Sequence, residues 1–407
     1  MSTNFNTCFI DSNGADVSQE FVEKSYLLDV YPNLINPAKA PSLWLWACNI
    51  DGNLGTNSTV DQSSPVQTVS GGTNWKEVHA GCLLTAAIKT DGTLWLWGNN
   101  LTGQLGNNSV LNQSSPVQTI SGGTNWKQVS SGCGHSAAIK TDGTLWLWGE
   151  ALNGRLGNNL SSLTKQSSPV QTVSAGTNWK QVSLGTNHSA AIKTDGSLWL
   201  WGCGTSGALG QATTTANQSS PVQTASVGTN WKQVSLGGTS TTSTSAAIKT
   251  DGTLWLWGDG TNGILGNNAT TARSSPVQTV SGGTNWKQVS LGSCHSAAIK
   301  TDGSLWLWGL AASGRLGNNS TVDQSTPVQT VSGGTNWKQV SAGTAHTAAI
   351  KTDGTLWLWG FGTAGRLGDN STVTRSSPVQ TILAGNNWKQ VSAGGCQTAA
   401  IKEEGDW

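Results

Sequence analysis

The chain has 407 residues and a formal net charge of +1, and only 11% of its residues are charged. A net charge this close to zero gives no bulk field toward nucleic acid or an anionic membrane surface. No apolar run approaches the roughly 18 residues that a membrane span needs. The unusual count is 22 Trp against 4 Phe and 2 Tyr, which indicates one short motif repeated many times.

Residues 1–42 do not match the rest of the chain, and we expect them to form an N-terminal arm. Asp16 and Gln19 could cap a short helix, whereas K-S-Y-L-L-D-V-Y could instead form a strand. No basic start precedes an apolar stretch, so a secretory signal is not expected. Because so short a segment cannot bury itself, it should pack on the rest of the chain or anchor it to another protein. The anchor candidates are the aromatic residues Phe5, Phe9, Phe21, Tyr26 and Tyr31.

From residue 43 the sequence L-W-L-W recurs seven times, every 51 to 56 residues, and a third Trp lies in each N-W-K. The alternation T-L-W-L-W predicts a strand with both Trp on one side. A-A-I-K predicts a second strand, joined to the first by a two-residue Asp-Gly hairpin turn. S-P-V-Q-T-V and W-K-Q-V-S add two more. Four short antiparallel strands in roughly 50 residues are typical of a β-propeller blade.

The two ends of the repeat region complement each other. The first L-W-L-W, residues 43–46, has no A-A-I-K before it, and the last A-A-I-K, residues 399–402, has no L-W-L-W after it. Pairing these terminal strands in one blade would close the sheet edges. The sequence therefore predicts an all-β fold: a seven-bladed β-propeller of four-stranded antiparallel blades over residues 43–407, with the arm outside it.

The motif W-G-x-x-x-x-G-x-L-G, together with G-x-x-H-[ST]-x-A-[IL]-x-x-D-G-x-[LV]-[YW]-x-W-G, resembles the RCC1 repeat over residues 43–407. The resemblance implies membership of the regulator-of-chromosome-condensation family of seven-bladed propellers. The founding member exchanges nucleotide on the GTPase Ran and binds chromatin, and other members inhibit β-lactamase or serve as interaction domains. A shared fold does not transfer these activities.

Four His share one repeat position: His135, His188, His295 and His346. Equivalent positions in neighbouring blades should lie on the order of 10 Å apart, too far to share a zinc ion bonded at about 2.0–2.1 Å. We therefore expect no metal site, and each His should hydrogen-bond backbone in its own turn. Seven Cys without C-x-x-C predict reduced thiols rather than a disulfide framework. The Lys of N-W-K and I-K should be solvated and evenly spread, without a basic stripe.

No catalytic group and no cofactor site is expected, so the protein is predicted to be non-enzymatic. Binding should lie in loops where near-identical repeats differ, although drift in unconstrained loops is the alternative explanation. Three Arg share the variable position of G-x-L-G and are expected to be solvated. The candidate partner-binding residues are Asn99, Asn100, Glu150, Leu152, Arg155, Leu310, Arg315, Phe361 and Arg366.

The preferred interpretation is a protein-interaction scaffold in a phage or virus particle, a capsid or tail decoration anchored by its arm and located in the virion. The alternative is a cytoplasmic regulator that binds a small GTPase or another protein. A β-lactamase inhibitor would require secretion. All interpretations expect protein partners, without nucleic acid or membrane insertion, and an oligomeric state set by the assembly.

Overall fold

The computed structural model describes residues 41–69, 74–161, 164–174, 176–214, 216–226, 228–383 and 385–403. The anchor candidates of the arm lie outside the described residues and stay predictions. Among the described residues, no helix combines the length and apolar character needed to cross a bilayer.

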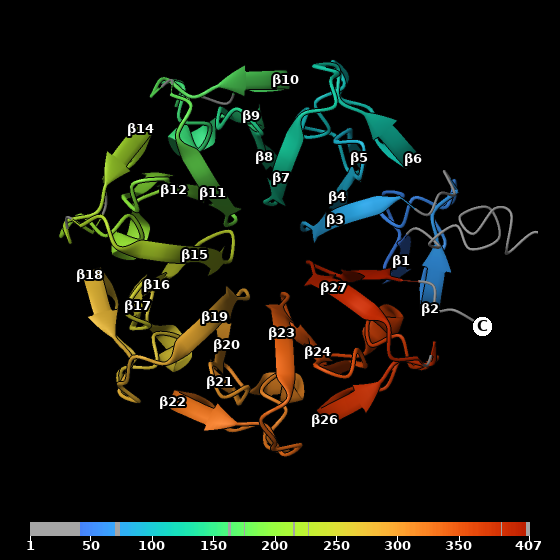
Figure 1. Cartoon of the computed structure of the whole chain (residues 1–407), viewed down its shortest axis with the longest axis vertical. Coiled ribbons are helices and arrows are strands. Elements are labelled where there is room, and N and C mark those ends of the chain that lie inside the picture. Colours follow the sequence, from blue (N-terminus) through green and yellow to red (C-terminus); the bar gives the residue numbers. More distant parts are fainter. Residues whose placement is uncertain are drawn as a thin grey trace, which may run out of the picture. The chain divides into compact units, whose positions relative to one another are not determined.

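Residues 41–403 form one compact unit of seven four-stranded antiparallel sheets arranged around a central channel (Figure 1). Blade one contains β3 (Trp75–Ala80), β4 (Leu84–Lys89), β5 (Leu94–Gly98) and β6 (Gln113–Gln118). Blade two contains β7 (Trp126–Ser131), β8 (His135–Lys140), β9 (Leu145–Glu150) and β10 (Lys165–Gln171). Blade three contains β11 (Trp179–Leu184), β12 (His188–Lys193), β13 (Leu198–Gly202) and β14 (Gln218–Gln223). In each blade the strands run in this order from the channel outward.

The remaining blades repeat the arrangement. Blade four contains β15 (Trp231–Gly238), β16 (Ser243–Lys249), β17 (Leu254–Gly258) and β18 (Arg273–Gln278). Blade five contains β19 (Trp286–Leu291), β20 (His295–Lys300), β21 (Leu305–Gly309) and β22 (Gln324–Gln329). Blade six contains β23 (Trp337–Ala342), β24 (His346–Lys351), β25 (Leu356–Gly360) and β26 (Arg375–Gln380). The short 3-10 turns are η1 (Leu152–Gly154), η2 (Thr205–Gly207), η3 (Thr261–Gly263), η4 (Ala312–Gly314) and η5 (Thr363–Gly365).

Blade seven is built from both ends of the repeat region, as the sequence predicts. Its strands are β27 (Trp388–Ala393), β28 (Gln397–Lys402), β1 (Ser42–Ala47) and β2 (Gln62–Gln67). β1 and β28 pair along their whole length, with Leu43 opposite Ile401 and Trp46 opposite Thr398. This pairing closes the ring, so the predicted fold is confirmed.

The hairpin turn between the two middle strands differs from the prediction. Ile88 pairs with Leu94, and the Lys89 amide donates to the Thr93 carbonyl, so the loop has three residues rather than two. Gly92 adopts a φ of +80°, the left-handed residue that closes a three-residue hairpin loop. The Asp91 carboxylate accepts hydrogen bonds from the amide and hydroxyl of Thr93. The Asp91 side chain therefore adds an Asx-type cap to the three-residue loop.

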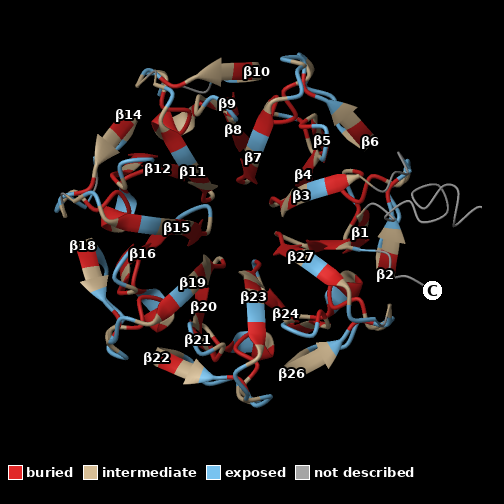
Figure 2. Cartoon of the chain, viewed as in Figure 1, coloured by how far each residue is buried: buried red, intermediate tan, exposed pale blue. Residues whose placement is uncertain are grey.

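The apolar core lies between neighbouring blades. Leu94 and Leu96 of blade one pack against Trp126 and Trp148 of blade two, and the two Trp rings lie 6.4 Å apart. Equivalent clusters occupy the other six blade interfaces. Figure 2 shows buried residues along the strands and exposed residues mainly in the peripheral loops. Because each core needs two blades, closure of the ring completes the last one.

In six blades the second Trp of L-W-L-W also fixes the G-x-L-G turn of the preceding blade through its indole N–H. The Trp148 indole donates a hydrogen bond of 2.8 Å to the Gln104 carbonyl. Gly106 has a φ of +69°, and a Cβ there would lie 2.8 Å from the Trp148 Nε1 atom. Only glycine meets both conditions, which explains why this residue is the same in every repeat.

The first Trp of each L-W-L-W is half-buried and lies under a lysine. The Nζ atom of Lys193 lies 4.9 Å from the Trp179 ring centroid and 4.5 Å from that of Trp199. The same arrangement recurs in blades one to six. The expectation of freely solvated I-K lysines was therefore wrong, because these ammonium groups make cation–π contacts with two rings.

Candidate functional site

The ring has two distinct faces. The loop face carries the loops from the first to the second strand and from the third to the fourth strand of each blade. The turn face carries the Thr-Asp-Gly turns and the connections to the next blade. These two elements touch, because the Trp126 amide donates to the Gly92 carbonyl at 3.0 Å. Every predicted partner-binding residue belongs to the loop face.

Glutamine side chains link neighbouring blades around the channel. Gln128 accepts a hydrogen bond from the Val182 amide at 2.9 Å and donates one to the Val182 carbonyl at 3.3 Å. The pattern repeats at Gln181, Gln233, Gln288, Gln339 and Gln390. Blade one has Glu77 instead, which accepts from the Val129 amide at 3.1 Å. Burial raises the pKa of Glu77 to about 7, against the opposing effect of this hydrogen bond.

A second belt of hydrogen bonds runs through serine side chains nearer the loop face. The Ser130 hydroxyl accepts from the Leu184 amide at 3.0 Å, and the equivalent bonds recur around the ring. In blade one His79 replaces serine, and its Nδ1 atom accepts from the Ser131 amide. Burial lowers the pKa of His79 to about 4, so the imidazole is a neutral acceptor. The polar side chains of both belts therefore have a structural role, because they join neighbouring blades around the channel.

The four repeated histidines also join blades. His135 Nε2 lies 3.1 Å from the Ser189 hydroxyl of the next blade, and the other three histidines contact the corresponding hydroxyl, those of Ser245, Thr347 and Thr398. The predicted partner, backbone of the same turn, was wrong, because the extended strand directs the ring across the blade interface. Burial lowers the pKa of all four, so they stay neutral at pH 7.

Asn100 shapes a loop from inside. Its side chain is fully buried and donates to the carbonyls of Ser109 and Leu111, while its oxygen accepts from the Leu105 amide. Asn49 makes the same bonds in blade seven. Asn99, beside it, is half-buried. The structure thus gives Asn100 a scaffold role in holding the loop that the sequence singles out.

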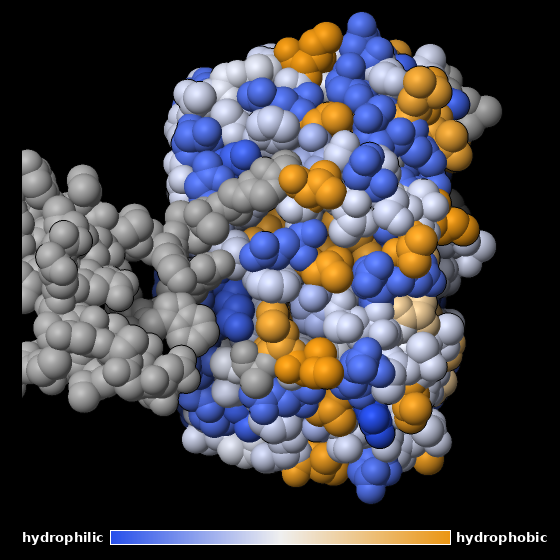
Figure 3. Space-filling view, turned by 90° about the vertical axis from the view of Figure 1, so that its right-hand side faces the viewer, coloured by the Kyte–Doolittle hydropathy of each residue, from blue (hydrophilic) through white to orange (hydrophobic). Residues whose placement is uncertain are grey.

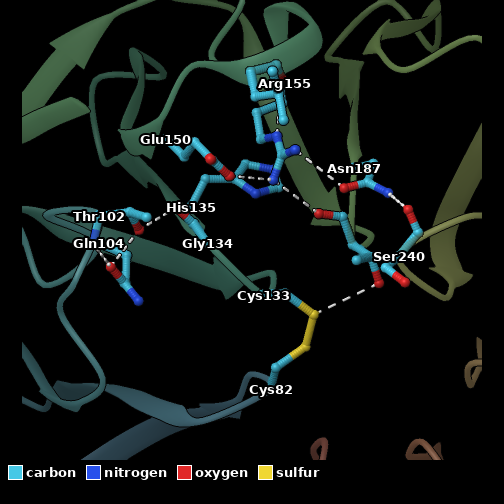
Figure 4. A network of polar contacts seen from close by, with 12 residues as sticks. Cys82, Thr102, Gln104, Cys133, Gly134, His135, Glu150, Arg155, Asn187 and Ser240 are labelled. Atoms are coloured by element: carbon cyan, nitrogen blue, oxygen red, sulfur yellow. Dashed lines mark hydrogen bonds and ion pairs between the residues drawn. A yellow bond between two sulfur atoms is a disulfide. The ribbon is translucent and has the colours of Figure 1, made fainter. Parts of the chain in front are cut away.

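Arg155 joins the loop faces of blades two and three (Figure 4). Its side chain is nearly buried, with 3% of the residue exposed. The guanidinium forms an ion pair of 3.1 Å with Glu150 and donates to the Leu152 carbonyl and to the Asn187 amide oxygen. Burial lowers the pKa of Arg155, and Glu150 opposes that effect. The expectation of a solvated arginine was wrong here.

The other two arginines of this position behave alike. Arg315 donates to the carbonyls of Ala312 and Thr344. Arg366 donates to the Thr363 carbonyl and lies 5.0 Å from the Phe361 ring centroid. Both are buried, while Leu152, Leu310 and Phe361 are half-buried. The candidates thus lie on four blades, one, two, five and six, rather than in one site.

Cys82 and Cys133 form a disulfide between blades one and two. Both lie in the inner loops that line the mouth of the channel on the loop face. The prediction of reduced thiols was wrong for this pair. The two A/S-G-C segments occupy the same position in adjacent repeats. This shared position could have predicted the disulfide, because equivalent inner loops of neighbouring blades converge at the channel.

An exposed apolar group on blades seven and one was missed by sequence reasoning. Asp51 accepts hydrogen bonds from Asn99 at 3.1 Å and Asn112 at 2.8 Å, and so ties the long loops of these blades together. Four aliphatic side chains on the two loops are between 61% and 69% exposed: Ile50, Val60, Leu101 and Leu111. Figure 3 shows the side that carries blades one and seven, with small apolar groups among hydrophilic ones. We call these four residues the apolar loop group.

Comparison with known proteins agrees with this architecture. The family model described as "RCC1-like domain" matches residues 38–330, and two models of the regulator of chromosome condensation (RCC1) repeat match residues 353–401 and 337–366. The ultraviolet-B receptor UVR8 of Arabidopsis thaliana is 31% identical over 331 residues, which cover 80% of this chain and 74% of the receptor. The human E3 ubiquitin-protein ligase HERC2 is 29% identical over 77% of this chain, but the match spans only 7% of the ligase.

Solved structures show the same fold. Human WBSCR16 superimposes with a TM-score of 0.77 at 20% identity, over 90% of this chain and 99% of that one. Prp20p from Saccharomyces cerevisiae superimposes with a TM-score of 0.78 at 18% identity, over 90% of this chain and 92% of that one. The repeat motif, the seven closed blades and the family match agree: the chain belongs to the RCC1-repeat family of β-propellers.

Proposed function

We propose that this protein is a non-enzymatic regulator that acts by binding a protein partner on its loop face. The apolar loop group carries the proposal. Four aliphatic side chains, each more than half exposed, stand on loops that Asn49, Asn100 and Asp51 hold in place. A rigid apolar group loses little conformational entropy on binding, and such exposed groups are typical of protein contacts.

The relatives support a regulator over a virion component. Prp20p of Saccharomyces cerevisiae has binding properties to Gsp1p and histones, and a further crystal structure shows Kap60 bound to yeast RCC1 (Prp20). Nothing among these relatives supports a capsid or tail role, so the virion interpretation is not carried forward. A cytoplasmic location and a small GTPase as partner belong to the proposal.

A binding assay with paired variants tests it. The purified chain is immobilised and offered cell extract with its small GTPases loaded with GDP or stripped of nucleotide. We expect a small GTPase to be retained in a nucleotide-dependent way, and the double substitution Leu101→Asp with Leu111→Asp to reduce retention at least tenfold. Val280→Asp with Val331→Asp, two aliphatic residues 52% and 54% exposed on connections of the turn face, is the control and should leave retention unchanged. Equal loss in both variants, or nucleotide-independent retention, would contradict the GTPase proposal.

A further inference from the structure

The charged residues of the ring separate by face. Among the described residues, the turn face carries fourteen lysines and seven acidic residues, a formal charge of +7. Its lysines are Lys76, Lys89, Lys127, Lys140, Lys180, Lys193, Lys232, Lys249, Lys287, Lys300, Lys338, Lys351, Lys389 and Lys402, and its acidic residues are Asp91, Asp142, Asp195, Asp251, Asp302, Asp353 and Glu403. The near-zero charge of the whole chain therefore conceals a face with a formal excess of lysines.

The loop face is neutral by the same count, and the remaining acidic residue of the described part, Glu77, lines the channel between the faces. Its six basic residues are Arg155, Lys165, Arg273, Arg315, Arg366 and Arg375, and its six acidic residues are Asp51, Asp61, Glu150, Asp259, Asp323 and Asp369. The sequence conceals this asymmetry because each repeat contributes the same two lysines and one acidic residue. Only the antiparallel register brings them to one end of each blade. Trp75 lies opposite Lys89 across the first two strands, for example.

The lysines form two circles around the channel on the turn face. The inner circle is the second residue of each innermost strand, and all seven of these lysines are exposed. Figure 2 shows an exposed stretch on each innermost strand. The outer circle is the I-K lysines, held over two Trp rings in blades one to six. Hydrogen bonds from Thr or Ser keep the pKa of the turn carboxylates low, so their charge is already included in the +7.

A ring of aliphatic side chains surrounds the lysines. It is made by the residue two positions after the outermost strand of each blade, where the chain reaches the turn face. The Ile120 amide donates to the Gly106 carbonyl, in the loop between the third and fourth strands of the same blade, at 2.9 Å, so these residues lie at the outer rim beside that loop. The exposed fraction is between 45% and 56% for six blades: Val69, Ile120, Val173, Val280, Val331 and Ile382. Ala225 occupies the position in blade three. Single exposed aliphatics are ordinary, but six equivalent ones on a basic face are a repeated feature.

We propose that the turn face docks on an anionic lipid bilayer, with the lysines at the headgroup phosphates and the Val and Ile side chains at the acyl boundary. Cationic and apolar groups on one surface are the combination that peripheral membrane binding uses. A polynucleotide would use the lysines but gives the aliphatic ring nothing to contact. The lysines also surround the channel on all sides, which suits a plane better than a rod. The loop face then stays free for the protein partner.

Vesicle binding of the full chain tests the inference. Sedimentation is measured with vesicles of phosphatidylcholine alone and with about one-third phosphatidylserine, at about 0.1 M and about 1 M salt, where the Debye length falls from about 10 to 3 Å. We expect binding only to the anionic vesicles and a large loss at high salt. Each exposed lysine should contribute up to about fivefold. The pair Lys127→Gln with Lys287→Gln should therefore weaken binding by up to about 25-fold.

Matched variants separate this surface from net charge. The loop-face pair Lys165→Gln with Arg273→Gln removes the same charge and should leave vesicle binding almost unchanged. Ile120→Ser with Val331→Ser should weaken vesicle binding several-fold but leave any binding of a DNA duplex unaltered. Near-ultraviolet circular dichroism checks that each variant is folded. Equal effects of the two charge pairs, no binding to anionic vesicles, or tighter binding to the duplex without any effect of the serine variants would each overturn the proposal.

Discussion

The Glu77 carboxylate accepts a hydrogen bond from the Val129 amide at 3.1 Å, in the place where six other blades use a glutamine. Each glutamine also donates to the carbonyl of the valine it faces, as Gln128 does to Val182. An ionised carboxylate cannot donate, so the belt is broken at Val129. A protonated Glu77 could restore the bond, which agrees with its raised pKa.

Glu77→Gln should stabilise the ring at neutral and alkaline pH. The folded-state pKa of Glu77 is raised from 4.5 to about 7, so its carboxyl favours the folded state fully below pH 4.5, and that contribution is lost as the pH rises to 7. The loss is about 3 kcal/mol. The free energy of unfolding of the variant should rise by up to that amount at pH 8 and stay unchanged at pH 4.5. Denaturant unfolding followed by Trp fluorescence measures both values. The reverse change, Gln128→Glu, should destabilise at pH 8. An equal gain at both pH values would refute this role.

His188→Gln should make the ring less sensitive to acid. Burial lowers the pKa of His188 from 6.5 to about 3, so the neutral ring stabilises the fold above pH 6.5 and this contribution is lost as the pH falls toward 3. Between pH 6.5 and 4.5 the loss is about 3 kcal/mol. Blade seven already has a glutamine here, Gln397, which donates to the carbonyls of Gly81 and Leu84. Acid titration monitored by circular dichroism should show a lower midpoint, and an unchanged midpoint would contradict the account.

Lys193→Met should destabilise the ring by about 1 kcal/mol, because it keeps the aliphatic stem but removes the ammonium from the rings of Trp179 and Trp199. Lys180→Met, at an exposed lysine of the same blade, is the control and should change stability by much less. Urea unfolding compares the two. Equal effects would mean that the cation–π geometry contributes nothing measurable.

Removal of residues 399–407 should abolish the stable ring. It deletes most of β28 and leaves β1 without the residues it pairs with from Ser42 to Leu45, so two sheet edges open. Deletion of residues 404–407 alone keeps β28 and should behave like the full chain. Thermal unfolding and gel filtration distinguish these outcomes. A full-chain melting profile for the longer deletion would disprove closure through blade seven.

The fold was predictable because the repeat supplies seven copies of each signal. The strand period and the turn glycine are local features of each copy. The complementary ends of the repeat region reveal the split blade. The contacts on the loop face were harder to predict from the sequence. Arg155 looks solvated in sequence, yet it is buried because Glu150 and Asn187 converge on it from two blades. Cys82 and Cys133 are 51 residues apart and meet only through blade geometry. The bridge from Asp51 to Asn99 and Asn112, which ties the loops of the apolar loop group together, joins two blades, and no local pattern indicates it.

Lysine footprinting tests the assignment of the protein-binding surface most directly. Among the described residues, Lys165 is the only lysine on the loop face, and its Nζ donates to the Leu101 carbonyl at 2.9 Å, beside the apolar loop group. The protein is acetylated with and without its bound partner, and the modified lysines are identified by mass spectrometry. The account predicts that the partner protects Lys165 and leaves Lys127, Lys232 and Lys338 of the turn face reactive. Protection of the turn-face lysines with Lys165 still reactive would contradict it.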